Sequence, residues 1–262
     1  MDSKFGRHIC MVVTFVALVS SAATRAAGAQ EAGFADARVP AVIAPAPALV
    51  GDAAAKEIMS KVIVENERRR GKLQHYTVTR KYEVRTHEGK VAAQDVVRME
   101  YQPPDLKTFE KTSGKGSGII RHLVFDRLME SETESGLGKQ RQESALTPAN
   151  YEFHLAGEDT IGVYHCFVLQ VAPKRKDKYL FEGKIWVESK DFAVTKIEGH
   201  PAKKLSFWVN QADFVREFQK VDEFWLPLRD ETQVDVKIYG KRVLVIDHGP
   251  YIFAVEAKRT AE

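Results

Sequence analysis

The chain shows two hydrophobic patterns, one with the spacing of a helix and one with the spacing of a strand. The positions that recur at helical intervals near the start are Ala55, Ile58, Met59, Val62 and Asn66. Asp52 is a favourable N-cap, so we expect an amphipathic helix from Asp52 to about Arg70. From Tyr76 the apolar period changes to two, which predicts a hairpin of strands at 76–84 and 91–101, followed by a strand from 106 to 112.

A second helix is predicted after the glycine-rich stretch SGKGSG at 113–118. This stretch lacks the Gly-Lys-Ser/Thr ending of a phosphate loop, so we interpret it as a mobile turn before a helix capped by Ser117. The apolar face of that helix holds Ile119, Ile120, Leu123, Val124, Leu128 and Met129. Because glycines at 114, 116 and 118 give backbone freedom beside it, we expect the helix at 117–134 to behave as a lid.

The rest of the chain has the period of a strand almost throughout. Further strands are predicted at 151–155, 163–171, 180–188, 193–199, 206–219, 225–238 and 242–253. Strand 225–238 alternates apolar and polar residues, as expected for a sheet with one buried and one wet side. In the stretch FEGKIWVESKDFAVTKIEG, Ile185 and Val187 share the apolar face, whereas Trp186 has the opposite parity and is expected to point toward solvent or to pack under the linker.

The first 51 residues have the composition of targeting and linker segments. Residues 1–29 resemble a secretory signal peptide, with a basic start, an apolar core from Ile9 to Val19 and a small-x-small cleavage site ending at Ala29. The core is shorter than the roughly 20 residues that span a bilayer. Residues 30–51 are rich in alanine and proline and are expected to form a linker. We therefore expect residues 52–262 to form one exported domain that is soluble after cleavage.

Charge and cysteine content exclude several classes of protein. Loss of residues 1–29 removes three basic residues and one acidic residue, which lowers the net charge from +3 to +1. Opposite charges are interleaved, so no basic stripe for nucleic acid is expected. Cys10 is lost with the leader, which leaves Cys166 unable to form an internal disulfide. Cys166 lies in an apolar run and is interpreted as a packed hydrophobic residue.

A family resemblance covers nearly all of residues 52–254. The stretches that carry it are VVRMEYQPPDLKTFE, VLQVAPKRKD, GKIWVESKDFAVTKIEG and VDEFWLPLRDETQ. Their order, with a helix before them and a Gly-rich turn and helix after the first, resembles the periplasmic lipoprotein carriers, the LolA/LolB-type outer-membrane lipoprotein-sorting proteins. The resemblance implies an α+β fold in which a strongly curved antiparallel sheet, an incomplete barrel, is closed by helices over an apolar cavity. It also implies a non-enzymatic carrier that is located in the periplasm and has neither cofactor nor metal.

The same resemblance implies where ligand binds. A cavity for the acyl chains of lipoproteins or lipids is expected, and its wall would be formed by Met99, Tyr101, Leu123, Leu128, Ile185, Val187, Phe214 and Phe218. The alternative is that these residues simply fill a closed core. Arg98 is the approximate counterpart of the arginine that ties lid to sheet in such carriers. The expected partners are an inner-membrane donor and an outer-membrane acceptor.

Two other functions remain open from the sequence. An envelope stress sensor of the same fold would bind a membrane-anchored partner instead of carrying cargo. A hydrolase is less favoured, because the histidines show no metal-ligand spacing and no G-x-S-x-G elbow is present. The acidic pairs Asp222-Glu223 and Asp230-Glu231 are interpreted as turn and solvent-face charges and not as acid/base groups, so no catalytic residue is predicted.

Overall fold

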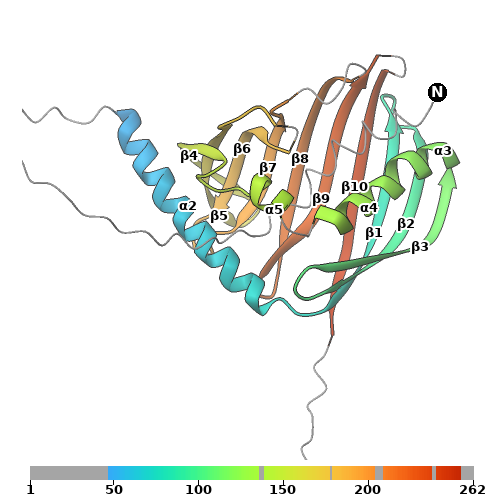
Figure 1. The fold of residues 1–262 in the computed structure, drawn as a ribbon, viewed down its shortest axis with the longest axis horizontal. Helices are drawn as coiled ribbons and strands as arrows, with labels where there is room; N and C mark the ends of the chain where they lie inside the picture. Colours follow the sequence, from blue (N-terminus) through green and yellow to red (C-terminus); the bar gives the residue numbers. More distant parts are fainter. Residues whose placement is uncertain (1–46, 136–138, 178, 204–208, 238–239, 255–262) are drawn as a thin grey trace, which may run out of the picture.

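The computed structural model describes residues 47–135, 139–177, 179–203, 209–237 and 240–254, which form one ten-stranded sheet with helices on one face (Figure 1). The strands are β1 (Tyr76–Thr86), β2 (Val91–Gln102), β3 (Leu106–Gly116), β4 (Tyr151–Ile161), β5 (Tyr164–Pro173), β6 (Phe181–Glu188), β7 (Val194–Pro201), β8 (Val209–Val221), β9 (Phe224–Val236) and β10 (Gly240–Phe253). The helices are α2 (Pro47–Lys72), α3 (Gly118–Ile120), the π-helix η2 (Arg121–Asp126), α4 (Arg127–Ser135) and α5 (Lys139–Ser144).

The strand order explains why helices cover the sheet. The order is β3-β2-β1-β10-β9-β8-β7-β6-β5-β4, and the paired strands are antiparallel. Strands β3 and β4 follow each other in sequence but lie at opposite edges. The connection between them, residues 117–150, therefore crosses the whole sheet, and it does so mainly as helix (Figure 1).

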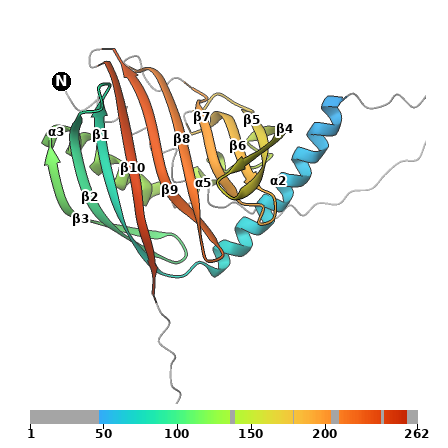
Figure 2. The same cartoon turned by 180° about the vertical axis from the view of Figure 1, so that it is seen from behind.

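The expected strongly curved, incomplete barrel is not what the sheet forms. The sheet is antiparallel as predicted, but it is open and not strongly curled, as the view from behind shows (Figure 2). Its edge strands β3 and β4 are separated by eight other strands and do not pair with each other. An open sheet has one face to bury and cannot enclose a cavity alone, so the helices are required to cover that face.

The predicted strands agree with the observed ones to within three residues, apart from β3 and β4, which extend to Gly116 and Ile161 instead of ending at 112 and 155. Strand β3 continues through the glycine-rich stretch to Gly116, because this stretch pairs with β2 as far as Ala93. Helix α2 begins at Pro47, before the expected cap Asp52, and so includes the last residues assigned to the linker. The residues predicted to form the signal peptide and the rest of the linker lie outside the described residues.

Two apolar clusters fill the space between the sheet and its helices. The first, which we call the central cluster, lies under η2 and α4 and consists of Tyr82, Val84, Ala93, Val97, Val124, Phe125, Leu128, Met129, Ala212, Val234, Val236, Leu244 and Ile246. The second, the α2 cluster, joins Ala55, Ile58, Met59 and Val62 to residues of β4 to β8. Helix α2 thus buries its predicted apolar face. No described helix has the length and apolar character needed to cross a membrane.

Candidate functional site

The helical segment 118–135, which we call the cover segment, combines α3, η2 and α4 and lies over the β3 side of the sheet, from β3 toward β9 (Figure 1). Ser117 caps it as predicted, since its side-chain oxygen accepts a hydrogen bond from the Ile120 amide at 3.3 Å. The segment buries Val124, Phe125, Leu128 and Met129. Ile119, which was expected on the apolar face, is 71% exposed. The π-helical turn in the middle is a rare geometry that recurs at functional sites.

Beneath the cover segment, the sheet presents an apolar wall. This wall is the strand part of the central cluster: Tyr82, Val84, Ala93, Val97, Ala212, Val234, Val236, Leu244 and Ile246, contributed by five strands. Each of these side chains is at least nine-tenths buried. Displacement of the cover segment would expose them together, because the segment supplies the helical side of the same cluster.

One ion-pair cluster ties the C-terminal part of the cover segment to the sheet. Arg80 of β1 donates hydrogen bonds to both carboxylate oxygens of Glu132 at 2.7 and 3.2 Å, and Lys107 of β3 donates to the same carboxylate at 2.7 Å. The Arg80 side chain is 5% exposed and that of Glu132 is 16% exposed. Burial alone would raise the pKa of Glu132, but Arg80 and Lys107 outweigh it and hold that pKa far below its usual range.

A second set of ion pairs holds the N-terminal part of the cover segment. Asp95 of β2 is fully buried and accepts a hydrogen bond from the Arg121 guanidinium of η2. Lys111 of β3 pairs with Asp126 at the end of η2. These contacts and the Glu132 cluster lie at opposite ends of the segment, so the segment is held to the sheet by charge at both ends and by apolar packing between them.

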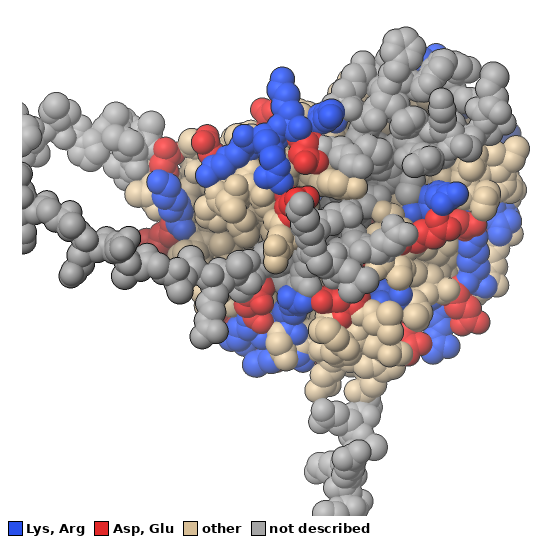
Figure 3. Space-filling model, viewed as in Figure 1, with Lys and Arg blue, Asp and Glu red and all other residues tan. Residues whose placement is uncertain are grey.

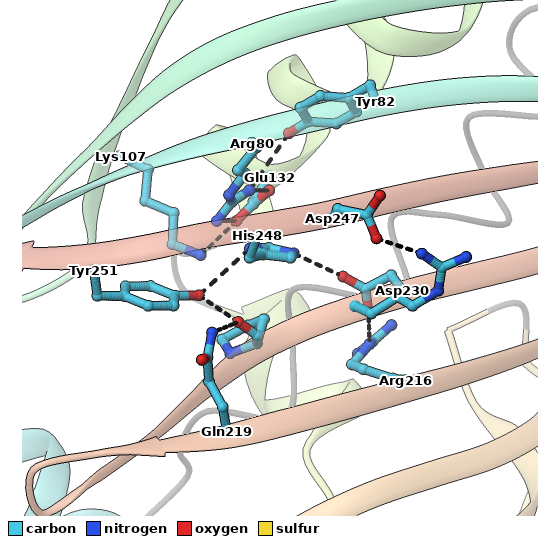
Figure 4. Close-up of polar contacts among 12 residues, drawn as sticks. Arg80, Tyr82, Lys107, Glu132, Arg216, Gln219, Asp230, Asp247, His248 and Tyr251 are labelled. Carbon is cyan, nitrogen blue, oxygen red and sulfur yellow. Dashed lines mark hydrogen bonds and ion pairs between the residues drawn. The ribbon is translucent and has the colours of Figure 1, made fainter.

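A row of buried polar residues continues from Arg80 across the middle of the sheet (Figure 4). His248 of β10 lies opposite Arg80 and contacts Asp230 of β9 with 3.0 Å between Nε2 and Oδ2. Asp230 in turn accepts from Arg216 of β8 at 2.5 Å. Burial and the nearby Arg80 lower the pKa of His248, whereas Arg216 and His248 overcome burial to lower the pKa of Asp230. The row is therefore a neutral histidine beside a buried arginine-aspartate ion pair.

The eight residues predicted to line one cavity are divided among separate parts of the structure. Ile185, Val187 and Phe214 belong to the α2 cluster and Phe218 packs against it. Met99 and Tyr101 belong to a third cluster, with Tyr76 and Val78. Leu128 belongs to the central cluster, and Leu123 is a partly buried residue of η2. The sequence thus found buried apolar residues, but it did not group them by the helix that covers them.

Arg98, the residue expected to tie the lid to the sheet, faces away from the cover segment. It lies between Val97 and Met99, which are buried on the helix-covered face, and strand alternation places Arg98 on the other face, where it is exposed. The contact to the cover segment is made by Arg80. A usable signal existed in the sequence, because Arg80 interrupts the buried parity of Val78 and Tyr82 on β1.

Trp186 and Asp230 also differ from their predicted surroundings. Trp186 is 7% exposed, because it packs with Cys166 and Val168 on the far face of the sheet and donates its Nε1 hydrogen bond to Asp159 at 2.9 Å. Cys166 itself is buried and free, as predicted. Asp230 is buried in the polar row and is not a solvent-face charge, whereas Glu231 is half-buried.

Elsewhere, a depression of about 340 Å³ lies among the turns at one end of β5, β6 and β8, and it is lined by Val163, Tyr164, His165, Glu188, Lys190, Asp191 and Lys220. Charged side chains that line the depression already have partners within the protein. Lys220 contacts Asp191 at 2.5 Å, and Glu188 accepts hydrogen bonds from the backbone amides of 190 and 191. On the face drawn in Figure 3, basic and acidic groups of the described residues lie next to one another. The cover segment and the wall below it are therefore the stronger candidate site.

Comparison with known proteins finds one family model and several distant structural matches. A family of unknown function (DUF5686) matches residues 142–245, and no curated protein matches the chain. The LolA superfamily protein NE2245 from Nitrosomonas europaea is similar in structure, with TM-score 0.41 and 11% identity over 77% of this chain and 94% of that protein. A domain assigned as an outer membrane lipoprotein-sorting protein from Vibrio parahaemolyticus has TM-score 0.39 and 12% identity over 80% and 95%. MucB has TM-score 0.29 and 10% identity over 76% and 94%. Each likeness concerns the fold and none bears on ligand or partner.

Proposed function

We propose that this protein is a non-enzymatic carrier of acyl chains, from lipoproteins or lipids, and that the cover segment is the lid of its binding site. The observation that carries the proposal is that residues 118–135 bury an apolar wall and are fastened at both ends by ion pairs to the sheet. Ion pairs can exchange with water when the segment moves, whereas the strands below are held by continuous hydrogen-bond ladders.

The wall has the chemistry that an acyl chain requires. Its nine residues are aliphatic apart from Tyr82, and the Tyr82 hydroxyl is directed to Arg80 at 3.4 Å. Removal of apolar surface from water stabilises a bound chain by about 25 cal/mol per Å², with no need for a specific polar contact. An acyl chain in the place of Val124, Phe125 and Leu128 would keep the wall dry.

The role in outer-membrane lipoprotein sorting, with an inner-membrane donor and an outer-membrane acceptor, is the finer part of the proposal. It requires export to the periplasm and cleavage after Ala29. N-terminal sequencing of protein from the soluble envelope fraction should give a first residue near Gln30. Recovery of Met1 from the membrane fraction would contradict export in soluble form.

The lid can be tested by locking it. Lys111 and Asp126 form a partly exposed ion pair between β3 and η2, so Lys111→Cys with Asp126→Cys can be joined by a short bismaleimide. Cys166 is buried and should not react. We expect the mature protein to bind a fluorescent fatty-acyl probe before the crosslink is made and to lose binding after it.

The matched control locks a different helix. Arg68 of α2 pairs with Glu223 in the β8–β9 turn at 3.1 Å, and both side chains are exposed. The Arg68→Cys, Glu223→Cys protein, joined by the same reagent, should bind the probe as the wild type does. A wild type that binds no probe, and whose native mass spectrum shows no lipid, would overturn the carrier proposal. Equal binding by the locked cover segment would show that it is not a lid.

A further inference from the structure

Arg80 lies between the apolar wall and the polar row, and this position determines which chemical group a ligand must place beside it. The guanidinium is buried, and its described hydrogen bonds go to Glu132 and the Tyr82 hydroxyl. Its Nε has no hydrogen-bond partner among the described residues. The ring of Phe109 lies 5.6 Å from the guanidinium, which leaves little room for water on that side.

Opening of the cover segment separates this charge from its partner. Glu132 moves with the cover segment, whereas Arg80 stays on β1 in the sheet. When an acyl chain replaces the cover segment and keeps the wall dry, Arg80 without Glu132 would be an uncompensated charge in a poorly solvated site, which is strongly unfavourable. His248, which lies opposite Arg80, cannot replace Glu132, because an imidazole carries no negative charge and its Nε2 contacts Asp230. A ligand-filled site therefore needs another anion beside Arg80.

We propose that the ligand is an amphiphile with an anionic headgroup, a carboxylate or a phosphate, whose oxygens take the place of the Glu132 carboxylate on Arg80 and Lys107. This inference rests on the proposed lid and names the class of ligand that it admits. The acyl tail then lies along the wall from Tyr82 toward Val84, which follow Arg80 on the same face of β1. In the closed protein, Glu132 acts as an internal substitute for the headgroup.

The exposure of the surrounding groups fits a headgroup that reaches water. Arg80 is buried, but Lys107, on the other side of the Glu132 carboxylate, is 22% exposed at its side chain. The headgroup site thus runs from a buried guanidinium to a partly solvated ammonium (Figure 4). Arginine binds carboxylate and phosphate oxygens with paired donors, and Arg80 already makes such a two-oxygen contact with Glu132.

The test compares ligands with the same tail and different heads by displacement of the acyl probe. The ligands are dodecanoate, dodecanol, dodecyl lysophosphatidic acid, dodecyl lysophosphatidylcholine and inorganic phosphate. We expect dodecanoate and lysophosphatidic acid to bind about tenfold or more tightly than dodecanol, which is the effect of one charge-assisted hydrogen bond. The ratio of the affinities for dodecanoate and lysophosphatidic acid shows whether the site prefers a carboxylate or a phosphate headgroup. Inorganic phosphate alone should not displace the probe.

Three variants test whether Arg80 is the source of the preference for an anionic headgroup. Glu132→Gln removes the internal competitor and should bind dodecanoate more tightly than wild type does. Arg80→Gln with Glu132→Gln removes both charges without leaving a buried ion, so it should fold, and it should lose most of the preference for dodecanoate over dodecanol, with the remainder due to Lys107. Arg98→Gln is the matched control, because this arginine lies on the adjacent strand and the opposite face; it should keep the wild-type preference.

Two results would overturn the inference. One is equal binding of dodecanol and dodecanoate by wild type, which would leave the carrier proposal intact. The other is an anionic preference that is undiminished in the Arg80, Glu132 double variant or disappears in Arg98→Gln, since a different group would then bind the anion. Failure of every amphiphile to displace or replace the probe is a different outcome and contradicts the proposed carrier function itself.

Discussion

The guanidinium of Arg121 lies where the first side-chain atom of any residue other than glycine at position 114 would be placed. A Cβ built on Gly114 overlaps both that guanidinium and the carboxylate of Asp95. The glycine is thus needed for the ion pair between β2 and η2, and not for freedom of the backbone before a lid. At Gly116, where φ is +79°, the same addition would meet the Ala92 backbone. Two of the three glycines of the predicted mobile turn therefore support close packing.

Gly114→Ala should loosen the N-terminal half of the cover segment. The added methyl group must displace Arg121 or Asp95, and overpacking of this kind costs about 1–3 kcal/mol. Urea unfolding should show this loss, and hydrogen exchange should show faster exchange at residues 118–126. Gly118→Ala is the control, because nothing lies within 4 Å of its added Cβ, and it should leave both measurements nearly unchanged.

The cover segment should exchange faster than the strands below it even in the wild type. Its contacts to the sheet are one apolar face and two sets of ion pairs, whereas β9 and β10 are hydrogen-bonded on both sides. Hydrogen exchange measured by mass spectrometry should therefore give earlier deuterium uptake for residues 118–135 than for 225–253. Equal and strong protection in both regions would contradict a lid.

Acid should weaken the attachment of the cover segment through Glu132. The pKa of this carboxylate is lowered in the folded protein, so its contribution is complete above the unfolded pKa of about 4.3 and is lost as the pH falls further toward the folded value. Each pH unit in that window removes up to about 1.4 kcal/mol. The free energy of unfolding should therefore fall more steeply below about pH 4 in wild type than in Glu132→Gln. Parallel curves would mean that Glu132 titrates normally.

Ile185→Glu should unfold the domain and not merely empty a binding site. Ile185 has no exposed surface and lies in the cluster that α2 covers, so an ionised carboxylate there has no partner and costs several kcal/mol. Lys184→Glu, the neighbouring exposed position, should change stability by no more than about 0.5 kcal/mol. A folded Ile185→Glu protein that has lost only probe binding would instead place the acyl site under α2.

Trp186→Phe should cost stability on the far face of the sheet. The substitution removes the hydrogen bond from Nε1 to Asp159 and weakens the contact of the Lys196 ammonium, which lies 4.8 Å from the ring centre. These losses should total about 1–2 kcal/mol in urea unfolding. Asp159→Asn keeps an acceptor for the indole and should lose less. An unchanged midpoint in Trp186→Phe would mean that neither contact stabilises the fold.

The sequence by itself determined the elements of this protein, because strand and helix periods are local properties of neighbouring residues. It placed the strands other than β3 and β4 to within three residues and found Ser117 as a helix cap. It also found most of the buried apolar positions, since burial on one face follows from alternation alone. The burial of Cys166 was likewise predictable from the apolar run around it.

Only the tertiary structure decided which of these residues share a site. Strand order sends residues 117–150 across the sheet, and this crossing brings Glu132 to Arg80 and divides the eight predicted cavity residues among three clusters and η2. The sequence also did not predict that the sheet stays open, because closure depends on whether the first and last strands in the order can pair. The packing of the whole chain decides which residues far apart in sequence come into contact, and local sequence patterns do not predict these contacts.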